Sequence, residues 1–531
     1  MGSSLRSPSF MPARYCAERS NMSSQTYLID TNVIIGLEDN HAVQPAFAAL
    51  LQLTSKHKTD VLVHEAARDD IARDRDLTRR QISLSKLDKF QILKKVRGYN
   101  LTELERDFGP LPRPNDVVDA LLLHALEIGA ADFLITQDRG LHDRARRKSP
   151  ELSRRVLFVA DAVQLLRTTF EPIEAPVRYV EEISANEIHL TDELFDSLRE
   201  DYDDFDKWWK DKCVKLRRPC WAVYDSGELA GLVVRKDERP EDTDAITKAG
   251  KILKICTFKV RPERRGVKLG ELLLKKVFWF AQINKYDVVY ITAYGGQEAL
   301  ISLLEYYGFV NKASKADGEL IYEKNFSRSK LHRLPGTSDF EIDRLNYPRF
   351  LSSPGISAFG VPIKEGYHDT LYPDLKSQPD LFEMSGTGSS PKTPGNTIRK
   401  VYLCRAQSKL GSSGSLLFFY KGVSNNPPSQ ALTAVGVFEE LTVAQSTKEL
   451  MLQAGGRSVY SEAELNRWGA SPERPVKVIN YLLAGYIDPP MSLALLNEIG
   501  VFHGQPAQSI FRIGEMQLNS ILQKLNLGFD V

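Results

Sequence analysis

Apolar positions in the first 170 residues fall into short runs separated by helix-like stretches. TYLI (26–29), DVLV (60–63) and DFLIT (132–136) have the length and composition of buried strands. PND at 114–116 has the composition of a helix start. Strands that alternate with helices predict a parallel sheet, whose ligands bind at the carboxyl ends of the strands.

Two further segments have different patterns. From residue 177 onward, strand-like runs lead to KILKICTFKV (251–260), a basic turn and a long amphipathic helix. Beyond residue 340, IRKVYLCRA (398–406), GSLLFFYKG (414–422) and ALTAVGVFEE (431–440) are short strands with turns. Such strands predict a small, mostly β barrel with flanking helices. The fold class is therefore multidomain α/β, with a β-barrel at the C-terminal end.

Segments rich in Pro and Gly separate these patterns. EPIEAP (171–176) ends the first and SRSKLHRLPGTSD (327–339) ends the second, while SGTGSSPKTPGN (385–396) is a predicted loop or linker. The first residues contain no apolar stretch typical of a secretory signal. The predicted organisation is a disordered tail followed by three domains, at residues 1–24, 25–172, 177–327 and 338–531.

Composition narrows the class of protein but does not specify a function. A net charge of +1 over 531 residues gives no global attraction to nucleic acid, so any such binding depends on local patches. No apolar run approaches the roughly 18 residues that a membrane span needs. The cysteines lack CxxC spacing, which favours free thiols and a cytoplasmic location. The five are Cys16, Cys213, Cys220, Cys256 and Cys404.

Acidic residues collect at predicted strand ends and helix starts in the first domain. Asp30 and Asp138 each follow a buried strand, and Asp116 and Asp119 share one face of a helix's first turn. Carboxylates that converge in one cleft repel one another unless a divalent cation neutralises them. Hard oxygen ligands select Mg²⁺ or Mn²⁺. The alternative is that these acids are helix caps and solvated faces, where Asp is common.

Residues 25–172 resemble a PIN-domain ribonuclease through LIDTNVI (28–34), NDVVDALLL (115–123) and LITQDRGL (134–141). The resemblance implies Mg²⁺ or Mn²⁺ held by about four acids, with metal-activated water cleaving RNA. It assigns Asp30, Asp119 and Asp138 as the first, third and fourth ligands and catalytic residues. The second is Asp70, with Glu65 and Asp69 as alternatives, and Asp116 could share the third role.

A basic run, RARRKSPELSRR (144–155), follows the last of these acids. It could track a phosphate backbone, but a solvated helix face is the favoured interpretation.

The turn RRGVKLG (264–270) opens the long helix of the second domain. Backbone N–H groups at a helix start, flanked by Arg and Lys, can cradle a pyrophosphate. Residues 177–327 resemble a GNAT acetyltransferase through this strand, turn and helix, and the resemblance implies acetyl-CoA as cofactor. It places the pantetheine arm beside residues 256–260. The cofactor-binding residues it implies are Phe258, Val260, Arg265, Gly266, Val267, Lys268, Leu269 and Gly270.

Two positions depart from the GNAT pattern. Lys268 stands where the family usually has Gly, and Leu304 stands where it usually has a Tyr that acts as general acid. Tyr306 and Tyr307 are shifted along the helix. Acetyl-CoA binding is therefore expected, whereas acetyl transfer needs another proton donor or water.

Residues 338–531 resemble a PUA-like barrel of the ASCH or EVE type, through the three strands and GQPAQSIFRI (504–513). The resemblance implies binding of RNA or modified nucleobases, with His368 and Tyr372 available for a pocket. The aromatic residues at 418–420 could stack bases, but alternating strand positions favour the core.

The leading hypothesis is a metal-dependent ribonuclease fused to an acetyl-CoA-binding domain and an RNA-reading barrel. One alternative is an acetyltransferase of tRNA or protein with a binding-only PIN domain, and another is a non-enzymatic nucleic-acid sensor. PIN and GNAT domains both occur as toxins, so an antitoxin or other partner protein, and an oligomer, are possible. This shared theme is an analogy between folds.

Overall fold

The computed structural model divides into two compact units. The first unit contains residues 1–43 and 51–158, and the second contains residues 44–50 and 159–531. The structure describes residues 26–36, 45–73, 77–93, 100–170, 178–225, 227–261, 268–327, 336–376, 393–395, 397–405, 410–424, 427–454 and 462–529. The predicted tail at 1–24 therefore lies outside the described residues.

The first unit contains a parallel sheet of five strands in the order β3-β2-β1-β4-β5, as the sequence pattern predicts. Its central strand, β1, is apolar because Tyr27, Leu28 and Ile29 are all buried. The elements are β1 (Thr26–Ile29), α1 (Thr31–Gly36), α2 (Pro45–Lys56), β2 (Asp60–His64), α3 (Ala66–Ala72), α4 (Leu77–Leu87), β3 (Gln91–Leu93), α5 (Leu101–Phe108), α6 (Pro114–Glu127), β4 (Phe133–Ile135), α7 (Arg139–Lys148), α8 (Pro150–Arg154) and β5 (Val156–Leu157). Residues 45–50 of α2 are assigned to the second unit.

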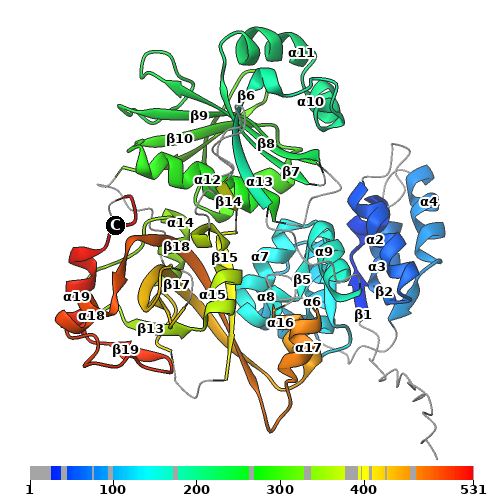
Figure 1. Ribbon diagram of the computed structural model, residues 1–531. Coiled ribbons are helices and arrows are strands. Elements are labelled where there is room, and N and C mark those ends of the chain that lie inside the picture. Colours follow the sequence, from blue (N-terminus) through cyan, green and yellow to red (C-terminus); the bar gives the residue numbers. More distant parts are fainter. Residues whose placement is uncertain are drawn as a thin grey trace, which may run out of the picture. The chain divides into compact units, whose positions relative to one another are not determined.

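The second unit begins with an eight-stranded mixed sheet in the order β11-β12-β10-β9-β8-β7-β6-β14. Its strands β9 and β10 are parallel. Helices α12 and α13 pack on one face, and the segment from α10 to η3 packs on the other (Figure 1). The elements are α9 (Val159–Phe170), β6 (Arg178–Ser184), η1 (Ala185–Glu187), η2 (Glu193–Phe195), α10 (Asp196–Asp201), α11 (Phe205–Trp208), η3 (Trp209–Val214), β7 (Pro219–Asp225), β8 (Glu228–Glu238), β9 (Ile252–Val260), α12 (Leu269–Ile283), β10 (Val288–Ala293), α13 (Glu298–Tyr306), β11 (Val310–Ser314) and β12 (Leu320–Asn325).

The second unit also holds a six-stranded mixed sheet in the order β15-β18-β17-β16-β13-β19. Among the strands that the structure describes, no ladder joins β15 to β19, so the predicted barrel is an open sheet. The elements are α14 (Asp339–Asn346), β13 (Ala358–Ile363), α15 (Glu365–Leu371), η5 (Pro373–Lys376), β14 (Thr393–Gly395), β15 (Arg399–Cys404), β16 (Leu416–Lys421), β17 (Ala431–Ala444), α16 (Thr447–Ala454), α17 (Glu462–Trp468), β18 (Val476–Ser492), α18 (Leu493–Glu498), β19 (Phe511–Ile513) and α19 (Glu515–Lys524).

Aromatic residues of the six-stranded sheet belong to its core. Phe418, Phe419 and Tyr420 are buried on β16, which confirms the core interpretation of this cluster. His368 and Tyr372, predicted as pocket residues, are also fully buried. His368 bonds to the Thr433 hydroxyl at 2.8 Å, which satisfies the buried ring.

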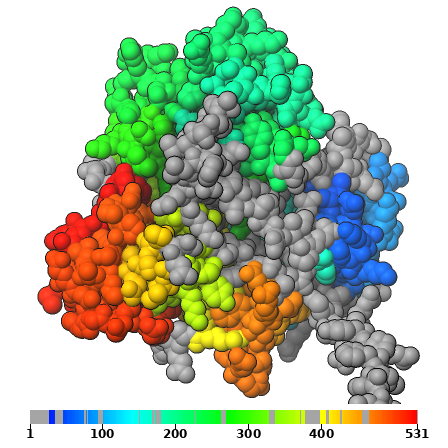
Figure 2. Space-filling model, viewed as in Figure 1, coloured from blue at the N-terminus to red at the C-terminus, as the bar shows by residue number. Residues whose placement is uncertain are grey.

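The two sheets of the second unit share one hydrophobic core. Phe278 of α12, Val435 of β17 and Ile521 of α19 belong to the same buried cluster. Figure 2 shows the red atoms of the C-terminal end beside the green atoms of the eight-stranded layer. The segment predicted as a loop at 385–396 contributes β14, which pairs with β6. No helix among the described residues is long and apolar enough to cross a membrane.

Candidate functional site

Strands β9 and β10 separate near the middle of the eight-stranded sheet. Their parallel pairing runs from Ile252 opposite Val288 to Ile255 opposite Ile291. Strand β9 continues to Val260 while paired with β8 on its other side. No described residue of β10 pairs with residues 256–260, so the sheet opens between two neighbouring strands at this point.

A β-bulge lies where the strands separate. Thr257 pairs with Val234 and Ile255 pairs with Arg235, which leaves Cys256 as the extra residue of β9. A bulge shifts the alternation of side chains by one position. Beyond it, Phe258 and Val260 pack on the same core as α12. The bulge therefore turns the two predicted cofactor-binding side chains of β9 toward the helix.

The start of α12 lies against these residues. A Cβ placed on Gly270 would be 3.1 Å from the Leu303 side chain and about as close as an ordinary contact to Phe258 and Val260. Lys268, the residue before the helix, has a φ of 61°, a conformation that favours Gly. Gly, which the GNAT resemblance leads us to expect here, would adopt this φ without strain. Leu269 is buried in the core, and Arg265, Gly266 and Val267 lie outside the described residues.

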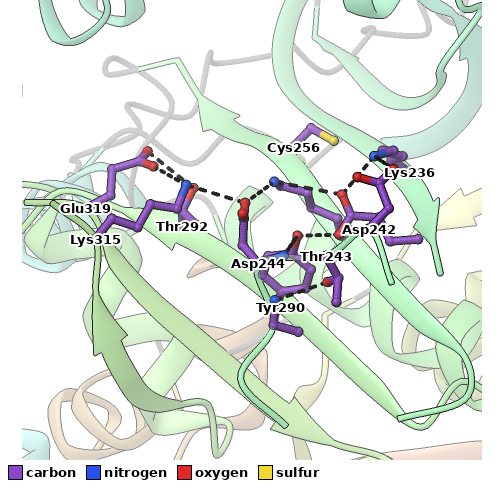
Figure 3. Close-up of polar contacts among 12 residues, drawn as sticks. Lys236, Asp242, Thr243, Asp244, Cys256, Tyr290, Thr292, Lys315 and Glu319 are labelled. Atoms are coloured by element: carbon purple, nitrogen blue, oxygen red, sulfur yellow. Dashed lines mark hydrogen bonds and ion pairs between the residues drawn. The ribbon is translucent and has the colours of Figure 1, made fainter. Parts of the chain in front are cut away.

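The opposite face of the sheet carries a polar network beside the opening (Figure 3). Glu319 accepts hydrogen bonds from Tyr202 Oη at 2.9 Å and Thr292 Oγ1 at 3.2 Å. Its other oxygen forms an ion pair with Lys315 Nζ at 2.9 Å. Lys315 also lies 3.5 Å from Asp244. Sequence reasoning missed this network because its members are far apart in the chain and form no motif.

Neither tyrosine at the end of α13 lies at the opening, where it could replace the general acid expected at Leu304. Leu304 and Tyr307 are buried in the core, and burial raises the pKa of Tyr307 well above its usual value. The ring of Tyr306 contacts the guanidinium of Arg344. Tyr294 directly follows β10, and its ring centroid lies 5.3 Å from that of Tyr202. Desolvation and the nearby Glu319 raise the pKa of Tyr294, so its hydroxyl stays protonated at neutral pH.

The surroundings of the cysteine in the bulge do not activate it as a nucleophile. Cys256 accepts a hydrogen bond from Arg218 Nη1 at 3.4 Å, yet burial raises the pKa of its thiol. Burial also raises the pKa of Cys213 and Cys220 to about 12. These thiols remain protonated and unreactive. The four described cysteines are all free, as the sequence predicts.

In the first unit, the predicted metal ligand Asp30 lies buried at the end of β1. Its carboxylate accepts bonds from the Thr31 amide at 2.6 Å, Asn32 Nδ2 at 2.7 Å and Thr136 Oγ1 at 2.6 Å. Burial raises its pKa to about 6, and the charges of Asp138 and Asp70 add to this effect. These hydrogen bonds thus offset part of the cost of burying the carboxylate, and the raised pKa shows that the ionised form is still destabilised.

The charge of Asp119 interacts with that of the Asp30 carboxylate. Burial raises its pKa to about 7, with further contributions from Asp30 and Asp138. By contrast, Asp116 pairs with Arg113 at 3.1 Å and with Arg144 at 3.2 Å, and the Arg113 hydrogen bond lowers its pKa. Asp116 is therefore held as the cap of α6, turned to two arginines.

The remaining predicted metal ligands are not buried. Asp70 pairs with Arg73 at 2.8 Å, whereas Glu65, Asp69 and Asp138 are exposed. Their oxygens suit Mg²⁺ or Mn²⁺ by type. However, among the residues that the structure describes, no three His, Cys, Asp or Glu side chains lie close enough together to hold a metal ion. The arrangement therefore does not fit a preformed metal site.

The basic run at 144–155 is partly structural. Arg144 is buried and donates to the Phe108 carbonyl at 2.8 Å. Arg155 donates to the carbonyls of Ala131 at 2.7 Å and Asp132 at 2.9 Å. These two side chains connect loops of the first unit, so the run is neither a continuous phosphate track nor wholly a solvated face.

Comparison with known proteins gives a family match for one segment of the chain. Residues 183–309 match the model of the acetyltransferase (GNAT) family, and the match includes no residue of the first unit. A search of curated proteins found no significant match. The matched segment contains the bulge, the separated strands and the start of α12.

Three solved structures are similar to parts of this chain. ASCH from Zymomonas mobilis is 13% identical, covering 32% of this chain and 96% of that chain, with a TM-score of 0.23. PaiA N-acetyltransferase from Thermoplasma acidophilum, in complex with coenzyme A, is 12% identical over 28% of this chain and 99% of that chain (TM-score 0.23). A GNAT family acetyltransferase from Elizabethkingia anophelis with acetyl-CoA bound is 14% identical over 28% and 99% (TM-score 0.21). These low values carry no conclusion about function.

Proposed function

We propose that the second unit transfers an acetyl group from acetyl-CoA to an amine. The observation that supports this most is the opening of the sheet at Cys256, where a bulge coincides with the end of the β9–β10 ladder. This opening lies inside the segment that matches the GNAT family. A gap between strands leaves backbone groups of β9 available to an extended ligand.

The residues present suit acetyl-CoA. Phe258 and Val260 form an apolar surface beside Gly270 at the start of α12, and a side chain at Gly270 would crowd Leu303. Amide groups at the start of a helix, together with the Lys268 ammonium, favour a pyrophosphate. The bound cofactor would supply a thioester carbonyl activated toward an amine. We assign Phe258, Val260 and the segment 265–270 to holding it.

Tyr294 is our candidate for the proton donor that Leu304 cannot provide. At neutral pH its Oη carries a proton that can be given to a departing thiolate, although its raised pKa makes it a weaker acid than a free tyrosine. Tyr202 packs against this ring and is oriented by its bond to Glu319. We assign Tyr202 as a positioning residue.

Two measurements test this function. Calorimetry should detect acetyl-CoA binding to the full chain, and Lys268→Glu should weaken it by more than tenfold through charge reversal. Thiol release with small amines should fall about 100-fold in Tyr294→Phe, whereas acetyl-CoA affinity should not change. Tyr367→Phe is the control, since this exposed tyrosine lies in the C-terminal segment. Absence of acetyl-CoA binding by the unmutated chain would refute the proposal.

A second function, cation-dependent cleavage of RNA by the first unit, is favoured by the coupled acids Asp30, Asp119 and Asp138. Concentrated negative charge at the carboxyl edge of a parallel sheet attracts a divalent cation. Because the acids are not gathered into a metal site, we assign no catalytic step to a metal. Total RNA incubated with and without Mn²⁺ tests this function. Cleavage that persists in EDTA and in Asp119→Asn would refute it.

The roles suggested for the remaining features stay predictions. RNA reading by the six-stranded sheet, a partner protein such as an antitoxin, and self-association are compatible with this fold. Deletion of residues 338–531 does not test the RNA-reading role cleanly, because these residues share a core with α12. Surface substitutions on β15–β19 are the appropriate test.

A further inference from the structure

The helical segment that covers one face of the eight-stranded sheet has an uneven charge distribution. Residues 192–206 are strongly acidic, whereas residues 207–218 contain six cations and one acid. We call the second stretch the basic segment, and the structure describes all of it. Its cations are Lys207, Lys210, Lys212, Lys215, Arg217 and Arg218.

Packing directs the lysines of the basic segment to solvent. Phe205, Trp209 and Cys213, four residues apart, are buried against the sheet. The lysines lie on the remaining faces and are exposed. The run therefore forms a surface of one charge sign around α11 and η3.

The positive charges of this surface are close together. The hydrogen bond from Lys215 lowers the pKa of the partly exposed Asp211, and the charges of Lys207 and Lys212 add to this effect. Lys215 pairs with Asp211 at 2.5 Å, and residues 207–218 contain no other acid, so six cations and one carboxylate leave this stretch with an excess of positive charge. Since the whole chain has a net charge of only +1, this excess is local.

Arg218 connects the basic segment to the opening in the sheet. Its guanidinium lies over the Trp208 ring at 5.6 Å, and its Nη1 donates to Cys256 Sγ at 3.4 Å. A polyanion bound along the lysines would therefore end beside the bulge. An aromatic ring next to a guanidinium also offers a surface on which a nucleobase can stack.

We propose that the basic segment docks single-stranded RNA and so presents an RNA-borne amine to the opening between β9 and β10. This inference rests on the proposed acetyl transfer, for which it names the substrate class. An anionic membrane would need several exposed apolar side chains beside the cations. Within residues 207–218, Leu216 alone is a strongly exposed aliphatic residue. RNA is thus the better match.

The test compares two triple variants of the full chain that carry the same change in charge. The first is Lys207→Glu, Lys212→Glu and Lys215→Glu. The control is Lys248→Glu, Lys285→Glu and Lys312→Glu, three exposed lysines outside the basic segment. Binding of a fluorescein-labelled oligouridine of about 15 nucleotides is measured by anisotropy. Circular dichroism melting checks that both variants fold.

The basic-segment variant should bind this RNA about 100-fold more weakly than the parent at about 0.1 M salt. Each lost phosphate contact contributes about 0.7 to the slope of log K against log salt, so the slope should become shallower by about 2. The control should remain within about twofold of the parent. Equal RNA affinities of the two triple variants would overturn the inference.

Two further measurements separate the alternatives. If vesicles of phosphatidylserine and phosphatidylcholine bind through the basic segment while oligouridine does not, the RNA inference is wrong. Thiol release with a small amine tests acetyl transfer independently of docking. RNA binding through the basic segment without thiol release would remove the acetyltransferase function and leave the docking surface. Thiol release without such binding would remove the docking inference alone.

Discussion

Asp119→Asn should stabilise the first unit, because it removes a carboxylate that the folded state destabilises. The pKa of Asp119 is raised from 3.8 to about 7 by burial and by Asp30 and Asp138. The folded state therefore binds this proton more tightly than the unfolded chain does. Stability from this group is fully present below pH 3.8 and is lost as the pH rises through about 7.

The size of this pKa shift sets the magnitude of the effect. Each pKa unit corresponds to about 1.4 kcal/mol, so ionised Asp119 destabilises the fold by up to about 4 kcal/mol above pH 7. Coupling to Asp30 and relaxation reduce this value, and about 2–3 kcal/mol is expected for Asp119→Asn at pH 8. At pH 5, where the folded state retains the proton, the gain should fall to about 1 kcal/mol.

The assay must follow the first unit by itself. All five tryptophans lie at residue 208 or beyond, so their fluorescence reports the second unit. Hydrogen exchange measured by mass spectrometry on peptides from β1 and β4 in the full chain gives the local free energy of opening. Asp69→Asn is the control, because Asp69 is exposed and should change stability by less than about 0.5 kcal/mol. A gain for Asp119→Asn that is absent at pH 8, or equal at pH 5 and pH 8, would refute this electrostatic reasoning.

Three further predictions concern the second unit. Lys268→Gly should raise its unfolding free energy by about 1 kcal/mol, as measured by urea denaturation, because it relieves a left-handed conformation; no gain would mean that the turn is unstrained. Gly308→Ala should lower the unfolding free energy of the second unit by more than about 2 kcal/mol, since a Cβ would overlap a backbone carbonyl of α14. Gly318→Ala has open space at a similar φ and should cost about 1 kcal/mol. Equal losses in the two variants would contradict this packing. Asp374→Asn should cost about 3–5 kcal/mol by leaving the buried Lys275 ammonium unpaired, and adding Lys275→Met should recover most of the loss; a tolerated single variant would show that the pair is not needed.

Elements with a local signal can be predicted from the sequence alone. The apolar runs that end at Asp30 and Asp138 predict short parallel strands, because only strands covered on both faces are apolar throughout. Pro114 and Asp116 mark the start of α6, and the Asp116 carboxylate accepts a bond from the Arg113 amide at 3.0 Å. Lys268 departs from the GNAT pattern, which usually has Gly there, and its left-handed φ explains why Gly is favoured at this position. Each of these features depends on residues within a few positions of one another.

Contacts between residues that are distant in the chain follow from the packing of the whole fold. Tyr202 and Glu319 lie 117 positions apart, and the polar network beside the opening exists because β10 and β12 pair. Arg144 forms an ion pair with Asp116, which turns this carboxylate away from the other acids. The periodicity of the sequence does not predict this contact. The bulge at Cys256 follows from the register between β8 and β9, which the pattern of one strand cannot encode. Register, long-range ion pairs and shared cores depend on how distant segments pack, and a single sequence specifies them only through the complete fold.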